Sequence, residues 1–455
     1  MRFIDRTMKI QFVFFVALSV CVQASSFAES WSRFRGPSGL GVSASEVRLP
    51  ESWSEQSNLS WKVPLPGPGA SSPIVSEKRV FVTCYSGYGV PNDTDRDIQK
   101  LRRHLLCFDL ETGEKRWQAS ARGSLQEDSY YETGVSSHGY ASHTPVTDGK
   151  YVYAFFGKSG VHAFTIDGQE LWQTQVGSGS DPPKWGSSSS PILHGNTLIV
   201  TAAAESQSLY GLDKATGSIV WQHKSKGLDG MWGTPTIVNV DGSRSDLVML
   251  VAGELWGLNP ATGELRWRIG ATDSKQAYTS ILFQGTRVFA FSGQGGGGLA
   301  IDLATTREQG GIPKIIWRST VNATYASPVS DGARIYLVSR GILSVLDSNS
   351  GKRLKQVRLK GAKETGGPFG SLDYASPVIH QDQLYYLNAR GQVYVFSTSP
   401  TLKLRSVNEL TVDREMFWGS PAICSGRLLL RSSAFLYCVA NSTRVHNRDA
   451  SRTSN

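Results

Sequence analysis

The sequence is poor in long apolar runs and in cysteine. Only the N-terminal segment, from Phe12 to Val22, is continuously apolar, and no later segment approaches the roughly 20 apolar residues of a membrane-spanning helix. The five cysteines include no adjacent pair, and His104, His138, His143 and His162 lack the spacing of zinc ligands. The lack of a long apolar run after Val22 argues against a membrane-spanning helix there, and the histidine spacing argues against a zinc site.

Motifs of common catalytic and metal sites are missing as well. No Ser-His-Asp set, nucleophile elbow or phosphate loop can be assigned, and Gly295 to Gly298 is a glycine run with no helix after it. The stretch Asp93 to Asp97 begins like a calcium loop, but Ile98 and His104 stand where an EF-hand needs Gly and Glu. We therefore expect no catalytic residue and no metal site.

The charged residues form no cluster. The net charge is +9, and the Lys and Arg residues are scattered along the chain. Nucleic-acid binding requires a basic patch interleaved with aromatic residues that stack on bases. The composition therefore predicts a mildly basic surface and no nucleic-acid partner.

The first 28 residues have the pattern of a secretory signal. The apolar run ends shortly before Ser26-Phe27-Ala28, a small-x-small cleavage site, and Val22-Gln23-Ala24 is a rival site. A basic start precedes it, made of Arg2, Arg6 and Lys9. We expect residues 1–28 to be removed and the chain to be exported, to the periplasm or the cell envelope.

A lipid anchor at Cys21 is not favoured. Leu18-Ser19-Val20-Cys21 resembles a lipobox, but Val20 stands where a small residue is expected. Cleavage after residue 28 would remove Cys21 altogether.

A short phrase recurs eight times: one or two small or aromatic residues, then Ser or Thr, then usually Pro. After a first interval of 72 residues, the Pro or its equivalent recurs every 44 to 49 residues. A repeat of that length with many short strands predicts a β-propeller with one sheet per blade. The phrases are Ala70-Ser71-Ser72-Pro73, Ser142-His143-Thr144-Pro145, Ser188-Ser189-Ser190-Pro191, Trp232-Gly233-Thr234-Pro235, Tyr278-Thr279-Ser280-Ile281, Tyr325-Ala326-Ser327-Pro328, Tyr374-Ala375-Ser376-Pro377 and Trp418-Gly419-Ser420-Pro421.

Each unit reads as four antiparallel strands, A to D, except the last. Residues 417–440 have room for strands A, B and C only, and Leu59 to Val63 reads as a stray strand D before the first unit. We therefore predict an all-β, eight-bladed propeller of four-stranded blades, residues 59–440, closed by that N-terminal strand. Closure removes exposed sheet edges. Residues 29–58 are then an N-terminal arm, and 441–455 a polar tail that we expect to be disordered.

The turn before strand D carries the pattern acid-x-x-Thr-Gly-x-x-x-Trp. Asp213, Thr216, Gly217 and Trp221 show it best; Trp117, Trp172 and Trp267 follow matching turns, and Trp317 follows a longer one. This pattern resembles the PQQ repeat over roughly residues 59–440. The family includes the quinoprotein alcohol dehydrogenases and the envelope protein BamB. Further phrases resemble a secreted planctomycete-type group of PQQ-like proteins: Trp31 to Pro37, Gly139 to Ser142, Gly157 to Gly160 and Trp185 to Ser187.

The resemblance implies the fold more firmly than the activity. Dehydrogenases of the family hold PQQ between a Trp and a disulfide of adjacent cysteines, beside a Ca²⁺ held by Glu, Asn and Asp. This chain has no adjacent cysteines and no matching ligands. We therefore expect no cofactor and a non-catalytic binding scaffold, monomeric, for an envelope protein or a small-molecule or glycan ligand. A PQQ- and calcium-dependent oxidoreductase with an atypical site and an aromatic-lined glycan-binding module remain alternatives.

Aromatic residues precede most of the recurring phrases and predict a ring at the channel mouth. Two interpretations stay open: packing that plugs the mouth, or a stacking surface for a flat or sugar-like ligand. The aromatic candidates are Tyr140, Trp185, Trp232, Tyr278, Tyr325, Tyr374 and Trp418, and three hairpin cations on the same face, Lys158, Arg340 and Arg390, would favour an anionic ligand.

The cysteines read mainly as buried core thiols. Cys107 and Cys438 occupy the same small slot of strand C, and Cys424 lies two strands from Cys438, too far for a bridge. Cys84 and Cys107 lie diagonally on neighbouring strands, so a Cys84–Cys107 disulfide is conceivable but not favoured.

Two long insertions belong to blade one. They are residues 87–104, between strands B and C, and residues 118–139, between blades one and two. Such loops emerge on the same face of a propeller, where binding sites are usually built. We therefore expect an entrance beside blade one.

Overall fold

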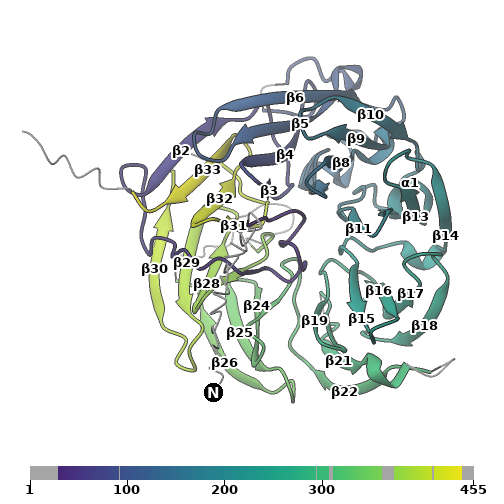
Figure 1. Cartoon of the computed structure of the whole chain (residues 1–455), viewed down its shortest axis with the longest axis vertical. Helices are drawn as coiled ribbons and strands as arrows, with labels where there is room; N and C mark the ends of the chain where they lie inside the picture. The colour runs from purple at the N-terminus through teal and green to yellow at the C-terminus, as the bar shows by residue number, and fades with distance from the viewer. Residues whose placement is uncertain are drawn as a thin grey trace, which may run out of the picture.

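The computed structural model describes residues 29–91, 93–293, 295–306, 311–360, 373–411 and 415–442. Eight sheets stand in a ring around a central axis (Figure 1). The predicted eight-bladed propeller is thus confirmed. The expected signal segment 1–28 and tail residues 443–455 lie outside the described residues.

Successive strands of each blade run from the axis to the rim. Blades one to three are β3–β6 (Ile74–Ser76, Arg79–Ser86, Arg102–Asp109, Lys115–Arg122), β7–β10 (Val146–Thr147, Tyr151–Phe155, Val161–Thr165, Glu170–Thr174) and β11–β14 (Ile192–His194, Thr197–Ala202, Ser208–Asp213, Ile219–Lys224). Blades four to six are β15–β18 (Thr236–Asn239, Ser245–Val251, Glu254–Leu258, Leu265–Gly270), β19–β22 (Leu282–Gln284, Arg287–Phe291, Gly298–Asp302, Lys314–Ser319) and β23–β26 (Val329–Ser330, Arg334–Ser339, Ile342–Asp347, Arg353–Arg358). Blade seven is β27–β30 (Val378–His380, Gln383–Leu387, Gln392–Ser397, Leu404–Glu409), and blade eight is β31–β33 (Ala422–Cys424, Arg427–Arg431, Phe435–Ala440) with β2 (Leu59–Pro64).

Helices are few and short in the described chain. They are α1 (Ala203–Ser206) and the 3-10 turns η1 (Ile98–Lys100), η2 (Gly134–Ser137), η3 (Gly157–Ser159), η4 (Lys226–Leu228) and η5 (Leu303–Thr306). Among the described residues, no helix is long and apolar enough to cross a membrane.

The N-terminal strand β2 closes the ring, as the sequence predicted. It pairs antiparallel with β33, with Trp61 opposite Cys438 and Pro64 opposite Phe435. In Figure 1 the purple β2 lies beside the yellow strands of the C-terminus. Strands from both ends of the propeller therefore share one sheet, and blade eight has its full four strands.

Strand-D tryptophans join four of the blades to the next. The Trp61 indole donates to the Leu110 carbonyl of blade one at 3.0 Å and packs against Gly113. A Cβ at Gly113 would lie 2.7 Å from the indole, so glycine is required in this turn. The same docking recurs in Trp117, Trp172 and Trp317, whose indoles donate to carbonyls of the following blade.

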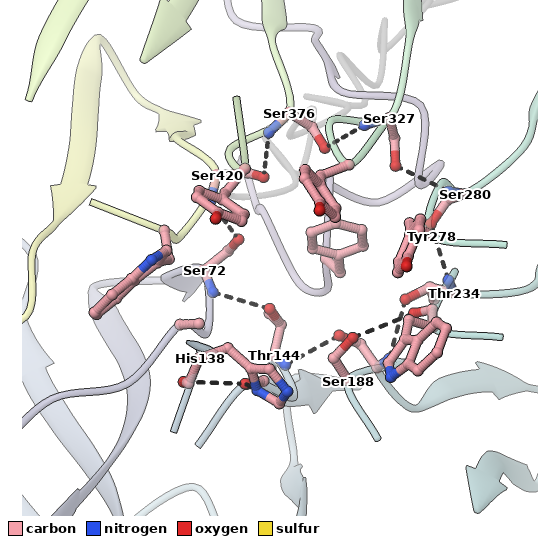
Figure 2. Close-up of a pocket in the computed structure, with 18 of the residues that line it drawn as sticks. Ser72, His138, Thr144, Ser188, Thr234, Tyr278, Ser280, Ser327, Ser376 and Ser420 are labelled. Carbon is pink, nitrogen blue, oxygen red and sulfur yellow. Dashed lines mark hydrogen bonds between the residues drawn. The ribbon is translucent and has the colours of Figure 1, made fainter. Parts of the chain in front are cut away.

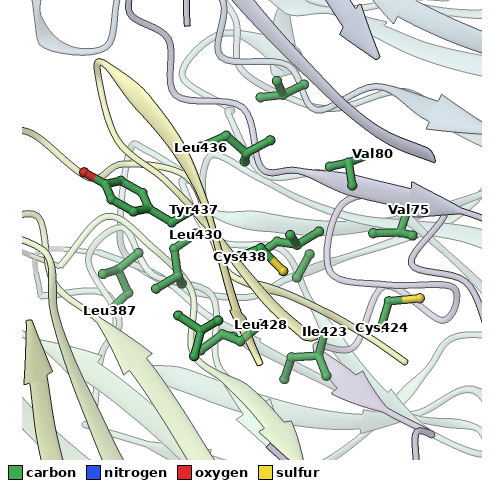
Figure 3. Packing of buried hydrophobic residues seen from close by; sticks show 14 of the residues in the cluster. Val75, Val80, Leu387, Ile423, Cys424, Leu428, Leu430, Leu436, Tyr437 and Cys438 are labelled. Atoms are coloured by element: carbon green, nitrogen blue, oxygen red, sulfur yellow. The ribbon is translucent and has the colours of Figure 1, made fainter. Parts of the chain in front are cut away.

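The strand-C positions opposite these tryptophans hold small residues. Cys107 faces Trp117, Gly211 faces Trp221, and Cys438 faces Trp61. Figure 3 shows Cys438 and Cys424 among the packed aliphatic side chains of blade eight. Cys84, Cys107, Cys424 and Cys438 are free thiols: the ladder sets Cys84 opposite His104 and Cys107 opposite Phe81. The Cys84–Cys107 disulfide is thus not formed.

A ring of hydroxyl groups encircles the central channel. In every recurring phrase, the backbone N–H of the Ser or Thr before the Pro position donates to the matching hydroxyl of the next blade, at 2.8–3.0 Å. The eighth bond, from Ser420 to Ser72, closes the circle. The ring consists of Ser72, Thr144, Ser190, Thr234, Ser280, Ser327, Ser376 and Ser420 (Figure 2).

Replacing one ring hydroxyl should destabilise the propeller. Ser327→Ala removes the acceptor of the Ser280 N–H, and an unpaired buried N–H costs about 1–3 kcal/mol. Ser327→Thr keeps the oxygen and should retain most of the stability, because Thr already fills this position in two blades. Chemical denaturation measures both free energies of unfolding. Equal stability of the Ala variant and the wild type would show that the ring bonds are dispensable.

The N-terminal arm crosses the channel instead of hanging free. Trp31 exchanges two backbone hydrogen bonds with Val75 of blade one, each 2.9 Å. Strand β1 (Val42–Ser43) then pairs parallel with β27, which gives blade seven a fifth strand on its axial side. Between these anchors the purple trace passes through the middle of the ring (Figure 1). The arm thus bridges blade one and blade seven.

Candidate functional site: the channel-mouth cavity

A cavity of about 180 Å³ occupies the mouth of the central channel. Its wall has two levels: the hydroxyl ring described above and, over it, an arc of aromatic side chains. The aromatic members are Trp185, Trp232, Tyr278, Tyr325, Tyr374 and Trp418. Figure 2 shows the ring hydroxyls and Tyr278 among the side chains that surround the cavity.

Five of the aromatic rings form a continuous arc from blade three to blade seven. Trp232 stacks on Tyr278 with ring centroids 5.0 Å apart, and Tyr325 stacks on Tyr374 at 5.1 Å. Tyr278 meets Tyr325 edge-on at 5.0 Å, and Trp185 lies 5.3 Å from Trp232. These contacts make the arc continuous along the wall of the cavity.

Phe34 of the N-terminal arm contributes to the cavity from inside the channel. The flanking residues Trp31 and Arg35 are buried, and a guanidinium nitrogen of Arg35 donates to the carbonyls of Leu40 and Pro328. Arg35 thereby ties the arm to blade six and fixes Phe34 beneath the mouth. The N-terminal arm, to which the sequence analysis assigned no role in the site, thus contributes a residue to the cavity wall.

His138 and Ser142 form a polar pair in the cavity wall near blade one. The His138 Nδ1 lies 2.6 Å from the Ser142 Oγ, and its Nε2 lies 2.7 Å from the Trp185 carbonyl oxygen. A carbonyl only accepts, so Nε2 carries the ring proton in the neutral form and Nδ1 accepts from the Ser142 hydroxyl. Burial lowers the pKa of His138, which favours that neutral form.

The cavity wall is uncharged. None of the described residues that line it is a Lys, Arg, Asp or Glu. With His138 neutral, the wall offers aromatic faces and hydroxyl groups only. Among the described lining residues, an anionic ligand would find no opposite charge, and a neutral ligand would leave no charge unpaired. The exposed Arg340, outside the lining, acts electrostatically on Tyr325.

The remaining sequence candidates lie outside this wall. Tyr140 is buried beneath the blade-one insertions, where its hydroxyl donates to the Asp128 carbonyl and its ring meets Tyr85 edge-on. Lys158 is buried and ion-paired with Asp128 at 2.8 Å. Arg340 and Arg390 are exposed and are not among the lining residues. The structure therefore brings together six of the ten sequence candidates.

A second, smaller cavity of about 30 Å³ lies next to the first and shares His138, Ser142 and Trp185 with it. Its wall includes two buried ion pairs, Arg103–Glu127 and Lys158–Asp128.

Glu205, from α1, is the one acid of this smaller cavity outside those two pairs among the described residues. Its Oε1 accepts from the Ser187 hydroxyl at 2.6 Å, while Oε2 has no hydrogen-bond partner in the part of the chain that the structure describes. Burial raises the pKa of Glu205 to about 7.

The residues of the main cavity do not fit PQQ. PQQ is a quinone with three carboxylates, and the described lining has no cation to face them. The chain has no adjacent cysteines, and among the described residues no group of three His, Cys, Asp or Glu side chains is placed to hold a metal ion. The chemistry of this wall thus differs from the one that the resemblance to quinoprotein dehydrogenases implied.

Comparison with known protein families supports the PQQ-type repeat of the sequence and the propeller fold of the structure. The model of the family described as outer membrane protein assembly factor BamB matches residues 42–181 and 102–357. The chain belongs to this family of PQQ-repeat propellers. A search of curated proteins gives no significant match.

Solved structures with similar folds include a BamB protein and dehydrogenases. BamB from Moraxella catarrhalis is 14% identical with a TM-score of 0.59, covering 85% of this chain and 99% of its own. A europium-containing methanol dehydrogenase is 11% identical, TM-score 0.61, covering 90% and 98%. Quinohemoprotein alcohol dehydrogenase from Comamonas testosteroni is 10% identical, TM-score 0.59, covering 94% and 83%. At these identities the similarity establishes the fold and leaves the activity open.

Sequence reasoning missed three parts of the site: the hydroxyl ring, Phe34 and the His138–Ser142 pair. The ring had a visible signal, because a Ser or Thr stands directly before the Pro position in all eight phrases. Phe34 and Ser142 stand in the phrases Trp31 to Pro37 and Gly139 to Ser142, which indicated a resemblance but no position in the site. Their contacts depend on how the arm and the second insertion fold over the channel.

Proposed function

We propose that this chain is an exported binding module that holds a neutral, ring-shaped ligand in the channel-mouth cavity, a sugar residue being the class that matches both levels of the wall. The observation that carries the proposal is the uncharged wall, with an aromatic arc over a ring of hydroxyl groups. Sugar rings present apolar C–H faces that pack on aromatic rings. Their hydroxyl groups exchange hydrogen bonds with Ser and Thr.

The size of the cavity suits one ring of such a ligand. A dry cavity of about 150 Å³ accommodates benzene, and the channel mouth is only slightly larger, at about 180 Å³. The ligand would therefore place one ring inside and leave its remainder outside. Ligands attached to polymers or to other proteins are compatible with that arrangement, as is a scaffold role in the cell envelope.

Export supports the same proposal. The N-terminal segment has the pattern of a secretory signal, and the chain belongs to the BamB family. A periplasmic or envelope location would expose the channel mouth to glycans and to envelope proteins. Fractionation of cells that express the full chain, with N-terminal sequencing of the product, tests this location: a mature protein that begins near Glu29 is expected, and a retained segment 1–28 in the cytoplasm would contradict it.

Trp232→Ala should weaken binding of a neutral aryl glycoside. Trp232 is central to the arc, where it contacts Trp185 and Tyr278. Loss of its stacking surface should lower the affinity for p-nitrophenyl β-glucoside at least about tenfold, equivalent to about 1.4 kcal/mol. Calorimetric or ligand-observed NMR titration measures the change. Trp232→Phe keeps an aromatic face and should retain more of the affinity.

The same pair of variants distinguishes the two interpretations of the arc. Unchanged binding by Trp232→Ala, together with a lowered melting temperature, would show that the arc only fills the mouth. The quinoprotein alternative has its own test, a titration with PQQ and Ca²⁺ followed by dye-linked alcohol oxidation. A tight, Ca²⁺-dependent response would overturn the proposed function.

A further inference from the structure

The His138–Ser142 pair has a feature that binding alone does not require: the serine proton is already directed at a base. The hydroxyl of Ser142 donates to His138 Nδ1 at 2.6 Å, and its oxygen lies on the cavity wall. Nucleophilic serines are activated in this way, by a neutral imidazole that a third group holds in position. Here the third group is the Trp185 carbonyl, 2.7 Å from His138 Nε2.

The local backbone holds both side chains rigidly. The turn η2 ends at His138, and the N–H groups of His138 and Gly139 both donate to the Val135 carbonyl. Gly139 has a φ of 72°, the left-handed conformation that glycine adopts without strain, and it turns the chain back past His138. Directly before Ser142, the Ala141 carbonyl accepts from the N–H groups of Ala70 and Ser71, in the loop before blade one. The pair is therefore positioned before any ligand binds.

A further hydroxyl lies in the same wall. Ser137, the last residue of η2, lines the cavity, and its Oγ is buried without a hydrogen-bond partner among the described residues. A buried hydroxyl without an acceptor is costly unless a bound group supplies one. Hydroxyl side chains also serve as donors to the oxyanion that develops in acyl transfer.

We propose that Ser142 is a nucleophile for neutral carboxylic esters, with His138 as its proton acceptor and Ser137 as a donor to the ester oxygen. This inference rests on the proposed function in one respect, that the cavity admits a neutral ring-shaped ligand. It goes beyond that function in assigning acyl transfer to the wall beside blade one. Esters of ring-shaped alcohols, such as acetylated sugars or aryl esters, are the substrate class.

The chemistry balances with water as the only co-reactant. Ser142 Oγ attacks the ester carbonyl carbon while its proton passes to His138 Nδ1. The bond between that carbon and the alcohol oxygen breaks, and the alcohol leaves with the proton from His138. Water then attacks the acyl-serine, His138 takes its proton and returns it to Ser142, and a carboxylic acid is released. The acid ionises in water, and the uncharged wall offers no cation to retain the product.

The experiment is covalent labelling of the purified mature protein with an uncharged alkyl fluorophosphonate. The expected result is a single adduct with loss of fluoride, located at Ser142 by peptide mass mapping. Ser142→Ala should abolish the adduct. His138→Gln should slow labelling at least about tenfold, because the amide still donates to the Trp185 carbonyl but is no base. Ser136→Ala, an exposed neighbour outside the cavity wall, should label like the wild type.

Several outcomes would overturn the proposal. They are no adduct, an adduct at another residue, or labelling of Ser142 that His138→Gln leaves unchanged. Mapping on the wild-type protein identifies the labelled residue even where a variant fails to fold. Hydrolysis of p-nitrophenyl acetate should follow the same order among the variants. Labelling requires no glycoside, so a chain that labels at Ser142 but binds no aryl glucoside would refute the proposed function alone.

Discussion

Trp61→Ala should lower the free energy of unfolding by about 3–5 kcal/mol, the range for removing a buried Trp side chain. Trp61 is 8% exposed and packs with the buried residues of blade eight and blade one. Its indole also donates to Leu110 and covers Gly113. The substitution thus leaves a cavity at the one place where the two chain ends close the ring.

Trp61→Phe is the matched control. It keeps a large aromatic side chain against Gly113 and loses the indole N–H, so it should cost only about 1–2 kcal/mol. Equilibrium denaturation of the three proteins measures the difference. A Trp61→Ala variant less than about 1 kcal/mol below the wild type would show that β2 is not essential to closure.

Glu205→Gln should make the protein more stable than the wild type at alkaline pH. Burial raises the pKa of Glu205 to about 7 in the folded protein, while its ordinary value is 4.5. Between these two values the unfolded chain releases a proton that the folded chain keeps, so the stability of the wild type falls as the pH rises. The loss amounts to about 3 kcal/mol once the pH exceeds 7.

The glutamine variant does not ionise and therefore lacks this loss. Its side-chain oxygen can still accept from the Ser187 hydroxyl, which is uncharged in both proteins. The stability difference between variant and wild type should grow by about 2–3 kcal/mol from pH 5 to pH 8, because part of the loss is already present at pH 5. Urea denaturation at the two pH values measures the difference, and one that stays constant would mean that Glu205 ionises as freely as in the unfolded chain.

The fold was predictable because most units carry the same two sequence signals at the same spacing. The Thr-Gly turn with its Trp marks strand D, and the Ser/Thr-Pro phrase marks strand A, so the missing strand of the last unit and the stray Trp61 segment matched each other. The structure adds the physical reason for both signals. The Trp docks on the turn of the next blade, and the Ser or Thr hydroxyl accepts from the N–H of the previous one.

The site was predictable only where it follows the repeat. Trp232, Tyr278, Tyr325, Tyr374 and Trp418 occupy equivalent positions, and all five line the cavity. Positions outside the repeat depend on tertiary contacts instead. Tyr140 turns toward the blade-one insertions, and Lys158, expected in an exposed hairpin, is buried against Asp128 from the second insertion. Propensity and spacing carry no information on such long-range partners.

Selection of a neutral ring by the channel mouth can be measured with one pair of ligands. p-Nitrophenyl β-glucoside and p-nitrophenyl β-glucuronide differ only in the carboxylate of the sugar. Titration of the wild-type protein with each should show binding of the glucoside, with the glucuronide at least about tenfold weaker, because the described wall has no cation to face a carboxylate. Equal or tighter binding of the glucuronide, or no binding of either ligand, would contradict the account.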